Sequence, residues 1–292
     1  MSTLPQVARI SLKNILFPTD FSPASSAALP FALTLAQIYG STLLLAHVLP
    51  PEPHRQVVTD RVPEEDAQVW QDARLHLAEF AADRSIMDIP CKRLMDRGAL
   101  DDVIPAMIRE HAIDMVVLGT HGRRGVSKLV LGSGAEKIYR SASCPVLTVG
   151  PKAHAGTWAL RRILCPVDVA GDPDPALHYA LSLAEEGQAE FMVMEAVPMV
   201  PWQHRDSVAH ERRAQMEKLI PEQARDWCVP QFLVRWEHPA EAILMAAAER
   251  QADLIVMGVR KARAAGWSAH LPWPVASEVV SRAPCPVLTV RV

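Results

Sequence analysis

The feature that most constrains this chain is an internal repeat, because one order of segments occurs twice. Three pairs show it: NILFPTDFSPASSAALPFALTLA (14–36) with RILCPVDVAGDPDPALHYALSLA (162–184), AIDMVVLG (112–119) with QADLIVMG (251–258), and SASCPVLTVG (141–150) with SRAPCPVLTVRV (281–292). So long a repeat predicts two copies of one domain rather than a single large core. We place the domains at 1–152 and 158–292, on either side of a seam rich in small and polar residues.

Within each copy, short apolar runs alternate with segments of helical periodicity. In the first copy the predicted strands are 14–20, 42–49, 91–96, 114–119 and 145–149, and the predicted helices are 22–39, 64–84, 100–111 and 133–141. Strands that are apolar throughout and joined by helices predict a parallel sheet covered on both faces. The expected fold class is α/β, with two tandem αβα sandwiches, each around a five-stranded, doubly wound parallel sheet. Ligands of such sheets bind beyond the carboxyl ends of the strands.

Composition narrows the choice of partners. A formal net charge of −3 gives no electrostatic footprint for nucleic acid. No apolar run reaches the roughly 18 residues that cross a bilayer, and the N-terminus does not resemble a secretory signal. The five cysteines form no CxxC pair, so we expect buried thiols in a reducing compartment. These observations predict a cytoplasmic protein without nucleic-acid or membrane partners.

One glycine-rich stretch, GTHGRRGVSKLVLGSG at 119–134, follows a predicted strand and opens a predicted helix. It matches neither the P-loop nor the Rossmann fingerprint. It could be a flexible surface loop, or a turn whose glycines only supply positive φ. It could also bind phosphate, because glycines allow close backbone approach and a helix start offers free N–H groups. In that reading, Ser133 adds a hydroxyl donor and caps the helix.

The glycines of this stretch have the pattern G-xx-G, nine residues, then G-S. The segment that follows it ends in SCPVLTV at 143–149. Together with the opening ILFPTDFS, this pattern resembles the nucleotide-binding signature of the universal stress protein family, and the likeness covers nearly the whole chain. The resemblance implies a tandem member with the adenine nucleotide alpha hydrolase-like fold and strand order 3-2-1-4-5. It also implies ATP as the cofactor of the N-terminal domain, with Mg²⁺ accompanying it.

The resemblance assigns eleven residues of this chain to the nucleotide. Those at the nucleoside end are Pro18, Thr19, Asp20, Val48 and Gly98, and those of the phosphate loop are Gly119, His121, Gly122, Gly132, Ser133 and Gly134. Asp20 could accept hydrogen bonds from ribose or adenine, or could instead cap the next helix in competition with Ser22. His121 could donate to phosphate or be an ordinary solvated histidine.

The second copy has lost most of this pattern. Lys261 stands where Gly122 did, and the GSG at 132–134 becomes the WPV at 273–275. We match Gly98 with His238, while Asp168 retains the acidic position. Proline has no N–H to donate, so we expect that this half does not bind ATP in the same way. Its tryptophans could be ordinary packing, or Trp267 and Trp273 could build a different pocket.

Three functions follow from these patterns. The first is an adenine-nucleotide-binding stress or signalling protein, whose two last strands pair within the chain and which could form a homodimer. The second is a slow ATP hydrolase, although no spacing identifies a catalytic residue and only His121, Asp101 or Asp102 could activate water. The third is a nucleotide-independent interaction module that uses the Trp/Pro-rich second half. The histidines lack metal-ligand spacing, so no metal site is predicted.

Overall fold

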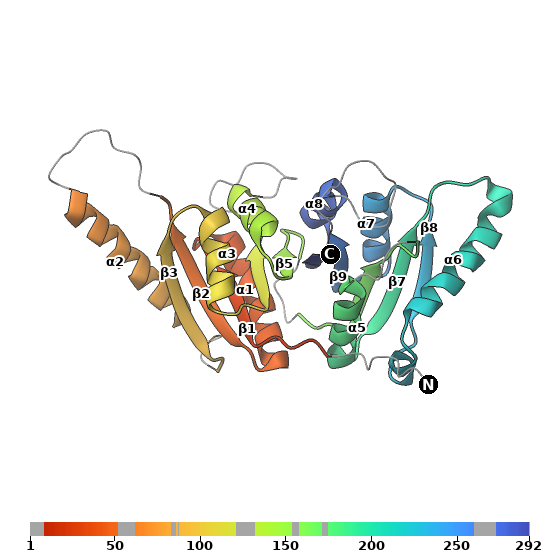
Figure 1. Ribbon diagram of the computed structural model, residues 1–292, viewed down its shortest axis with the longest axis horizontal. Coiled ribbons are helices and arrows are strands. Elements are labelled where there is room, and N and C mark those ends of the chain that lie inside the picture. The colour runs from red at the N-terminus through yellow and green to blue at the C-terminus, as the bar shows by residue number, and fades with distance from the viewer. Residues whose placement is uncertain are drawn as a thin grey trace. The chain divides into compact units, whose positions relative to one another are not determined.

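The computed structural model describes residues 9–51, 62–82, 86, 88–120, 132–153, 158–170, 175–259 and 273–291. Two compact units divide this part of the chain (Figure 1). The first contains the described residues between 12 and 146, and the second contains residues 9–11 and those from 147 onward.

The first half of the chain alternates strands and helices. Its elements are β1 (Asn14–Pro18), α1 (Pro23–Tyr39), β2 (Thr42–Leu49), α2 (Val62–Ala81), β3 (Cys91–Arg97), α3 (Leu100–Glu110), β4 (Met115–Gly119), α4 (Ser133–Ser141) and β5 (Val146–Val149). The strand order is β3-β2-β1-β4-β5, and β1 pairs in parallel with both β2 and β4. This order confirms the predicted doubly wound sheet.

The second half repeats the scheme with two short 3₁₀ helices added. Its elements are β6 (Arg162–Pro166), α5 (Pro175–Gly187), β7 (Glu190–Ala196), η1 (Trp202–His204), α6 (Arg205–Leu219), η2 (Glu222–Asp226), β8 (Gln231–Arg235), α7 (Pro239–Glu249), β9 (Leu254–Val259), α8 (Trp273–Arg282) and β10 (Val287–Arg291). The order β10-β9-β6-β7-β8 is the same arrangement, and all four pairs are parallel.

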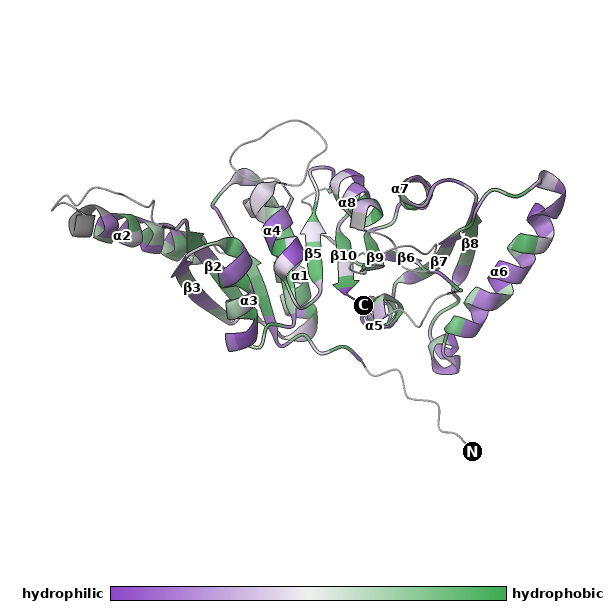
Figure 2. Ribbon diagram, turned by 45° about the horizontal axis from the view of Figure 1, so that its top comes forward, coloured by the Kyte–Doolittle hydropathy of each residue, from purple (hydrophilic) through white to green (hydrophobic). Residues whose placement is uncertain are grey.

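The central strands are apolar because helices cover both faces of each sheet. Ile15, Leu16 and Phe17 of β1 are successive residues, and each is 0% exposed. Figure 2 shows this contrast in colour, with hydrophobic central strands and helices that alternate along their length. Apolar burial of this kind contributes roughly 25 cal/mol per Å² removed from water. The sheet therefore forms the rigid base from which the strand ends project.

Most predicted element ends agree with the structure to within three residues. Helix α2 ends at Ala81, three residues before its predicted end, and α3 ends one residue early. The prediction that all cysteines are buried is wrong for Cys91, which is exposed because it begins the edge strand β3, and for Cys144, which is only half-buried. Among the described residues, no helix is both long and apolar enough to span a membrane.

In each half, an arginine and a tryptophan join the outer helix to the end of the edge strand. The arginine is on the strand side in the first half and on the helix in the second. In the first half, the guanidinium of Arg97 at the end of β3 lies 5.6 Å from the ring centroid of Trp70 on α2. In the second half, Arg205 on α6 lies 5.4 Å from the ring centroid of Trp236, which follows β8. Each contact is a cation–π pair between helix and strand end.

Candidate functional site

The candidate site of the first unit lies at the carboxyl ends of β1 and β4. These two strands are neighbours, and the chain leaves β1 toward α1 and leaves β4 toward α4. Such a point, where the strand order reverses direction, is where doubly wound sheets bind ligands. The register of these strands thus brings Thr19 and Asp20, which follow β1, beside Gly119 at the end of β4 and Thr120 after it.

The turn after β1 is fixed by hydrogen bonds. Thr19 is buried, and its hydroxyl lies 2.6 Å from the Ser25 hydroxyl. The same hydroxyl accepts from the Phe21 N–H at 3.0 Å. Phe21 has φ of +60°, a left-handed conformation that is uncommon for a residue other than glycine. Pro18, which precedes the turn, is the last residue of β1.

The structure decides which side chain caps α1. Ser22 is the N-cap and accepts from the Ser25 N–H at 3.2 Å. Asp20 instead accepts from the Ser22 N–H at 3.0 Å, and its side chain remains half-buried at the sheet edge. Asp20 therefore shapes the turn, and its carboxylate lies at the carboxyl end of β1.

Val48 and Gly98 lie further along the same edge. Val48 is half-buried on β2, opposite Asp96 of β3. Gly98 follows β3 and has φ of +153°, and a Cβ there would lie 2.8 Å from a methyl of Val103. Its N–H donates to the carbonyl of Leu49 at 3.0 Å. The need for glycine at this position therefore arises from internal packing as well as from any ligand.

Gly119 also has an internal explanation. A Cβ at this position would lie 2.3 Å from the carbonyl oxygen of Ala24, in the first turn of α1. Real side chains essentially never approach a backbone oxygen so closely, so only glycine lets α1 pack against the end of β4. The space beside this glycine is thus filled by helix α1.

The start of α4 is tied to the end of β4. The Gly132 N–H donates to the Thr120 carbonyl at 2.7 Å, so this predicted phosphate donor already has an acceptor. Gly132 is the N-cap, and the prediction that Ser133 caps the helix is wrong, because Ser133 is its first helical residue. Its side chain is exposed.

The first turn of α4 retains main-chain donors. The first helical hydrogen bond runs from the Glu136 N–H to the Gly132 carbonyl. The N–H groups of Ser133, Gly134 and Ala135 therefore have no acceptor within the helix, at its positive end. A Cβ on Gly134 would lie 3.3 Å from a methyl of Leu100, a tight contact that a small shift of that side chain would relieve. His121 and Gly122 lie outside the described residues.

The acidic residues near this helix start are engaged or exposed. Asp101 lies 3.6 Å from the Lys137 ammonium, which links α3 to α4. Asp101 and Asp102 are both exposed in the first turn of α3. Within the described part of the chain, no group of three or more His, Cys, Asp or Glu side chains could hold a metal ion. The described geometry thus offers anion donors more clearly than it offers a catalytic base.

The strand registers align the two halves position by position. Pro18 pairs with Ala46 in one sheet and Pro166 with Met194 in the other, which matches Asp20 with Asp168. The Asp168 carboxylate likewise accepts from the N–H two residues later, at 2.8 Å. The halves thus share this aspartate contact after the first strand, but the left-handed residue Phe21 has no counterpart, because Val169 has a negative φ.

The registers correct the predicted match between Gly98 and His238. Gly98 corresponds to Glu237, whereas His238 is the N-cap of α7 and corresponds to Ala99, the N-cap of α3. Pro274 lies exposed in the first turn of α8, where it provides no N–H. Lys261 and Trp267 lie outside the described residues.

Sequence reasoning missed one functional candidate in the second half, Glu195. It follows Met194 on β7 and occupies the position of His47 on β2. Glu195 is buried, with only 5% of its surface exposed. An acidic residue directly after the apolar run FMVM, on a buried strand, was the signal that could have found it.

Comparison with known proteins agrees with this duplicated geometry. The profile of the universal stress protein family matches residues 11–150 and 159–291, which together make up most of the chain. The chain belongs to the universal stress protein family. It is 32% identical to universal stress protein A homolog 1 of Coxiella burnetii over 147 residues, which cover 48% of this chain and 97% of that protein. Half of this chain thus corresponds to one whole relative.

Longer relatives show the tandem arrangement. This universal stress protein is 24% identical to one from Mycolicibacterium smegmatis, with 95% of this chain and 97% of that protein covered. A crystal structure of a universal stress protein from Archaeoglobus fulgidus has the same fold, with a TM-score of 0.71 and 18% identity, and covers 95% of this chain and 98% of that one. The tandem α/β architecture therefore occurs in other members of the family.

Proposed function

We propose that this universal stress protein binds one ATP, or another adenine nucleotide, in its N-terminal domain (1–152) and acts in stress response or signalling. The observation that carries the proposal is the meeting of Asp20, Thr120 and the first turn of α4 at one sheet edge. A carboxylate suits the hydroxyl and amino donors of a nucleoside, and free N–H groups at a helix start suit phosphate.

The proposed roles follow the two ends of this edge. The nucleoside would lie against Pro18, Thr19, Asp20, Val48 and Gly98, and the phosphates against Gly119, His121, Gly122, Gly132, Ser133 and Gly134. Because the Gly132 N–H is engaged by Thr120, the main-chain donors for phosphate would be those of Ser133, Gly134 and Ala135. Mg²⁺ would enter with the triphosphate, since this ion binds mostly phosphate oxygens and water in such sites.

The C-terminal domain (158–292) is proposed to bind no ATP in this way. Pro274 removes one N–H from the first turn of α8, at the place where α4 offers Ser133. Asp168 keeps the aspartate contact after the first strand, but a carboxylate alone offers no donor to phosphate. We therefore expect one nucleotide per chain.

Equilibrium dialysis of the full-length protein against labelled ATP with Mg²⁺ tests this proposal. The expected result is saturation at about one ATP per chain, with competition by unlabelled adenine nucleotides ranking their affinities. Saturation at two per chain would contradict the assignment of the second domain. An absence of binding at millimolar ATP would contradict the proposed function as a whole.

A second candidate function is a nucleotide-independent interaction module. Trp202 is 80% exposed and Val229 is 89% exposed, and both flank α6 in the second half. Tryptophan is enriched in protein–protein interfaces, so the exposed Trp202 supports this alternative. Slow ATP hydrolysis stays a third possibility, and turnover that disappears in Asp101→Asn would support it. We also propose a cytoplasmic location, pairing of the two last strands and a homodimer, the last of which sedimentation velocity can test.

A further inference from the structure

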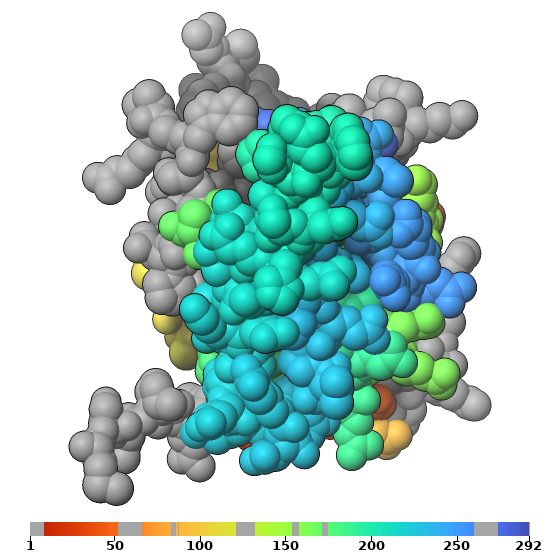
Figure 3. Space-filling model, turned by 90° about the vertical axis from the view of Figure 1, so that its right-hand side faces the viewer, coloured from red at the N-terminus to blue at the C-terminus, as the bar shows by residue number. Residues whose placement is uncertain are grey.

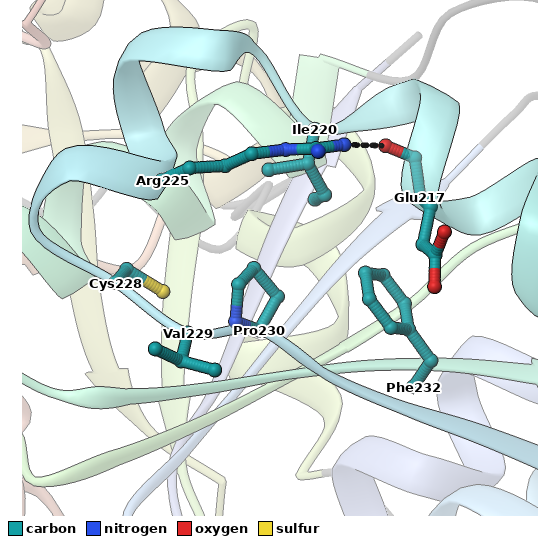
Figure 4. Close-up of a pocket in the computed structure, with 7 residues that line it drawn as sticks. All are labelled: Glu217, Ile220, Arg225, Cys228, Val229, Pro230 and Phe232. Atoms are coloured by element: carbon teal, nitrogen blue, oxygen red, sulfur yellow. Dashed lines mark hydrogen bonds between the residues drawn. The ribbon is translucent and has the colours of Figure 1, made fainter.

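Helix α6 of the second half covers the edge strand β8 with few buried side chains. Among its residues only Met216 is buried, and it is 0% exposed. Figure 3 shows α6 and η2 forming this outer face of the second half. A groove of about 350 Å³ lies at the C-terminal end of α6, lined by Glu217, Ile220 and Phe232 among others (Figure 4). Apolar packing thus holds α6 only weakly.

Polar contacts also hold α6 on the sheet of the second half. Arg205 lies over the Trp236 ring at the start of the helix. One turn before Met216, Arg212 reaches toward the sheet, where its Nη1 lies 3.6 Å from Oε1 of Glu195 on β7. The Glu195–Arg212 pair therefore links the middle of α6 to a strand in the interior of the sheet.

Glu195 itself is poorly compensated. Its Oε1 accepts one long hydrogen bond, from the Val169 N–H at 3.4 Å. Its Oε2 is buried and has no hydrogen-bond partner among the described residues. An ionised carboxylate in such surroundings loses its hydration without full replacement. In the first half the same position holds His47, whose Nδ1 lies 2.7 Å from the Thr19 carbonyl.

The charges around Glu195 act in both directions. Burial raises the pKa of Glu195 to about 7, with the neighbouring Asp168 carboxylate adding to the rise, whereas Arg212 and the Val169 N–H lower it. Among the described residues, Arg212 from α6 and Asp168 from the segment after β6 are the charged groups that act on it. Its register partner on β8 is the neutral Val234. While α6 is packed on the sheet, which we call the closed state, these surroundings favour the protonated, uncharged form of Glu195.

We propose that Glu195 is a proton-controlled latch for α6. With the carboxyl group protonated, α6 stays packed over β7 and β8. Loss of the proton favours a state in which α6 lifts from the sheet and the carboxylate becomes hydrated. The lifted state would uncover Met216 and the edge strand β8, a surface that another chain could pair with.

The direction follows from proton linkage. A hydrated glutamate has its ordinary pKa of 4.5, below that of the closed form. The closed state therefore binds more protons than the open one between these values, so raising the pH shifts the equilibrium toward opening. From pH 5.5 to pH 8 the opening constant would rise roughly 30-fold. This inference does not depend on nucleotide binding.

Hydrogen exchange of the full-length protein tests the latch. Protection factors, which correct for the intrinsic pH dependence of exchange, are measured for peptides of α6 and α7 at several pH values from 5.5 to 8. We expect α6 to lose protection roughly 30-fold over this range, while α7 loses far less. In Glu195→Gln, α6 should show no such loss. Glu190→Gln is the matched control on the same strand, because that side chain is exposed, and it should behave as the original protein.

A second variant keeps the test decisive. Arg212→Gln removes the charge that lowers the pKa of Glu195, so the midpoint of the α6 transition should move to lower proton concentration, that is, to higher pH. An unchanged midpoint in this variant would overturn the latch. So would unchanged α6 protection across the range, a loss in Glu195→Gln equal to that of the original chain, or equal losses in α6 and α7.

Discussion

The Gly132 N–H donates to the carbonyl oxygen of Thr120 at 2.7 Å, which fixes the start of α4 beside the end of β4. The contact uses up one of the donors that the glycine-rich sequence offers to an anion. It also orients the helix so that its next N–H groups stay available at the sheet edge. The candidate nucleotide site therefore depends on donors that follow Gly132 rather than on Gly132 itself.

Ser133→Pro should weaken ATP binding by roughly 10- to 100-fold, the value of one hydrogen bond to a charged group. Proline suits the first position of a helix, and Gly132 already has the extended backbone that a following proline requires. Ser133→Ala keeps the N–H and should cost less. Calorimetric titration of both variants with ATP makes the comparison, and equal affinities would remove the main-chain donor from the proposed site.

Gly119→Ala should destabilise the fold by roughly 1–3 kcal/mol, because its Cβ would meet the Ala24 carbonyl oxygen, which cannot move without shifting α1. Gly134→Ala is the control. Its Cβ would meet only the movable side chain of Leu100, and alanine favours a helix. Urea unfolding followed by circular dichroism measures both. Similar stability of the two variants would refute the packing role of Gly119.

Ser22→Ala should lower the free energy of unfolding by about 1 kcal/mol, since it removes the cap that accepts from the Ser25 N–H. Ser133→Ala should change the free energy of unfolding by only a few tenths of a kcal/mol, because Ser133 follows the N-cap Gly132 and makes no cap hydrogen bond. Thermal unfolding at one fixed pH compares the two. A larger loss of stability in Ser133→Ala than in Ser22→Ala would contradict both capping assignments.

Glu195→Gln should stabilise the protein at pH 8 and have little effect near pH 4.5. The folded-state pKa of about 7 exceeds the ordinary value, so the folded state binds more protons in between. The free energy of unfolding therefore falls as pH rises from about 4.5 to about 7, by at most about 3 kcal/mol. Denaturant unfolding from pH 5 to pH 8 should show this slope in the original chain and not in the variant. Parallel curves would contradict the prediction.

The fold could be predicted because it rests on local periodicity and on a repeat. The apolar runs of β1 and β4 and the glycine C-cap of α1 at Gly40 are all readable along the chain. The site could be predicted only in part. That Gly119 faces Ala24, or that Glu195 faces Arg212, depends on residues far apart in sequence, so neither contact leaves a local pattern.

Position alone also misled at single residues. Ser133 has the residue type of an N-cap, but the hydrogen bond from Gly132 to Thr120 starts the helix one residue earlier than a serine cap would require. Cys91 lies in an apparent strand, yet the strand is at the edge of its sheet, where side chains face solvent. Strand order, which decides exposure, is a property of the assembled sheet.

The exchanged arginine–tryptophan pairs carry a consequence for any attempt to recombine the halves. A chimera that placed α6 on the first sheet would set Arg205 against Arg97, two like charges. The reciprocal chimera would bring the indoles of Trp70 and Trp236 together with no cation between them. After the duplication, each helix has thus become matched to its own strand, and the two copies are no longer interchangeable parts.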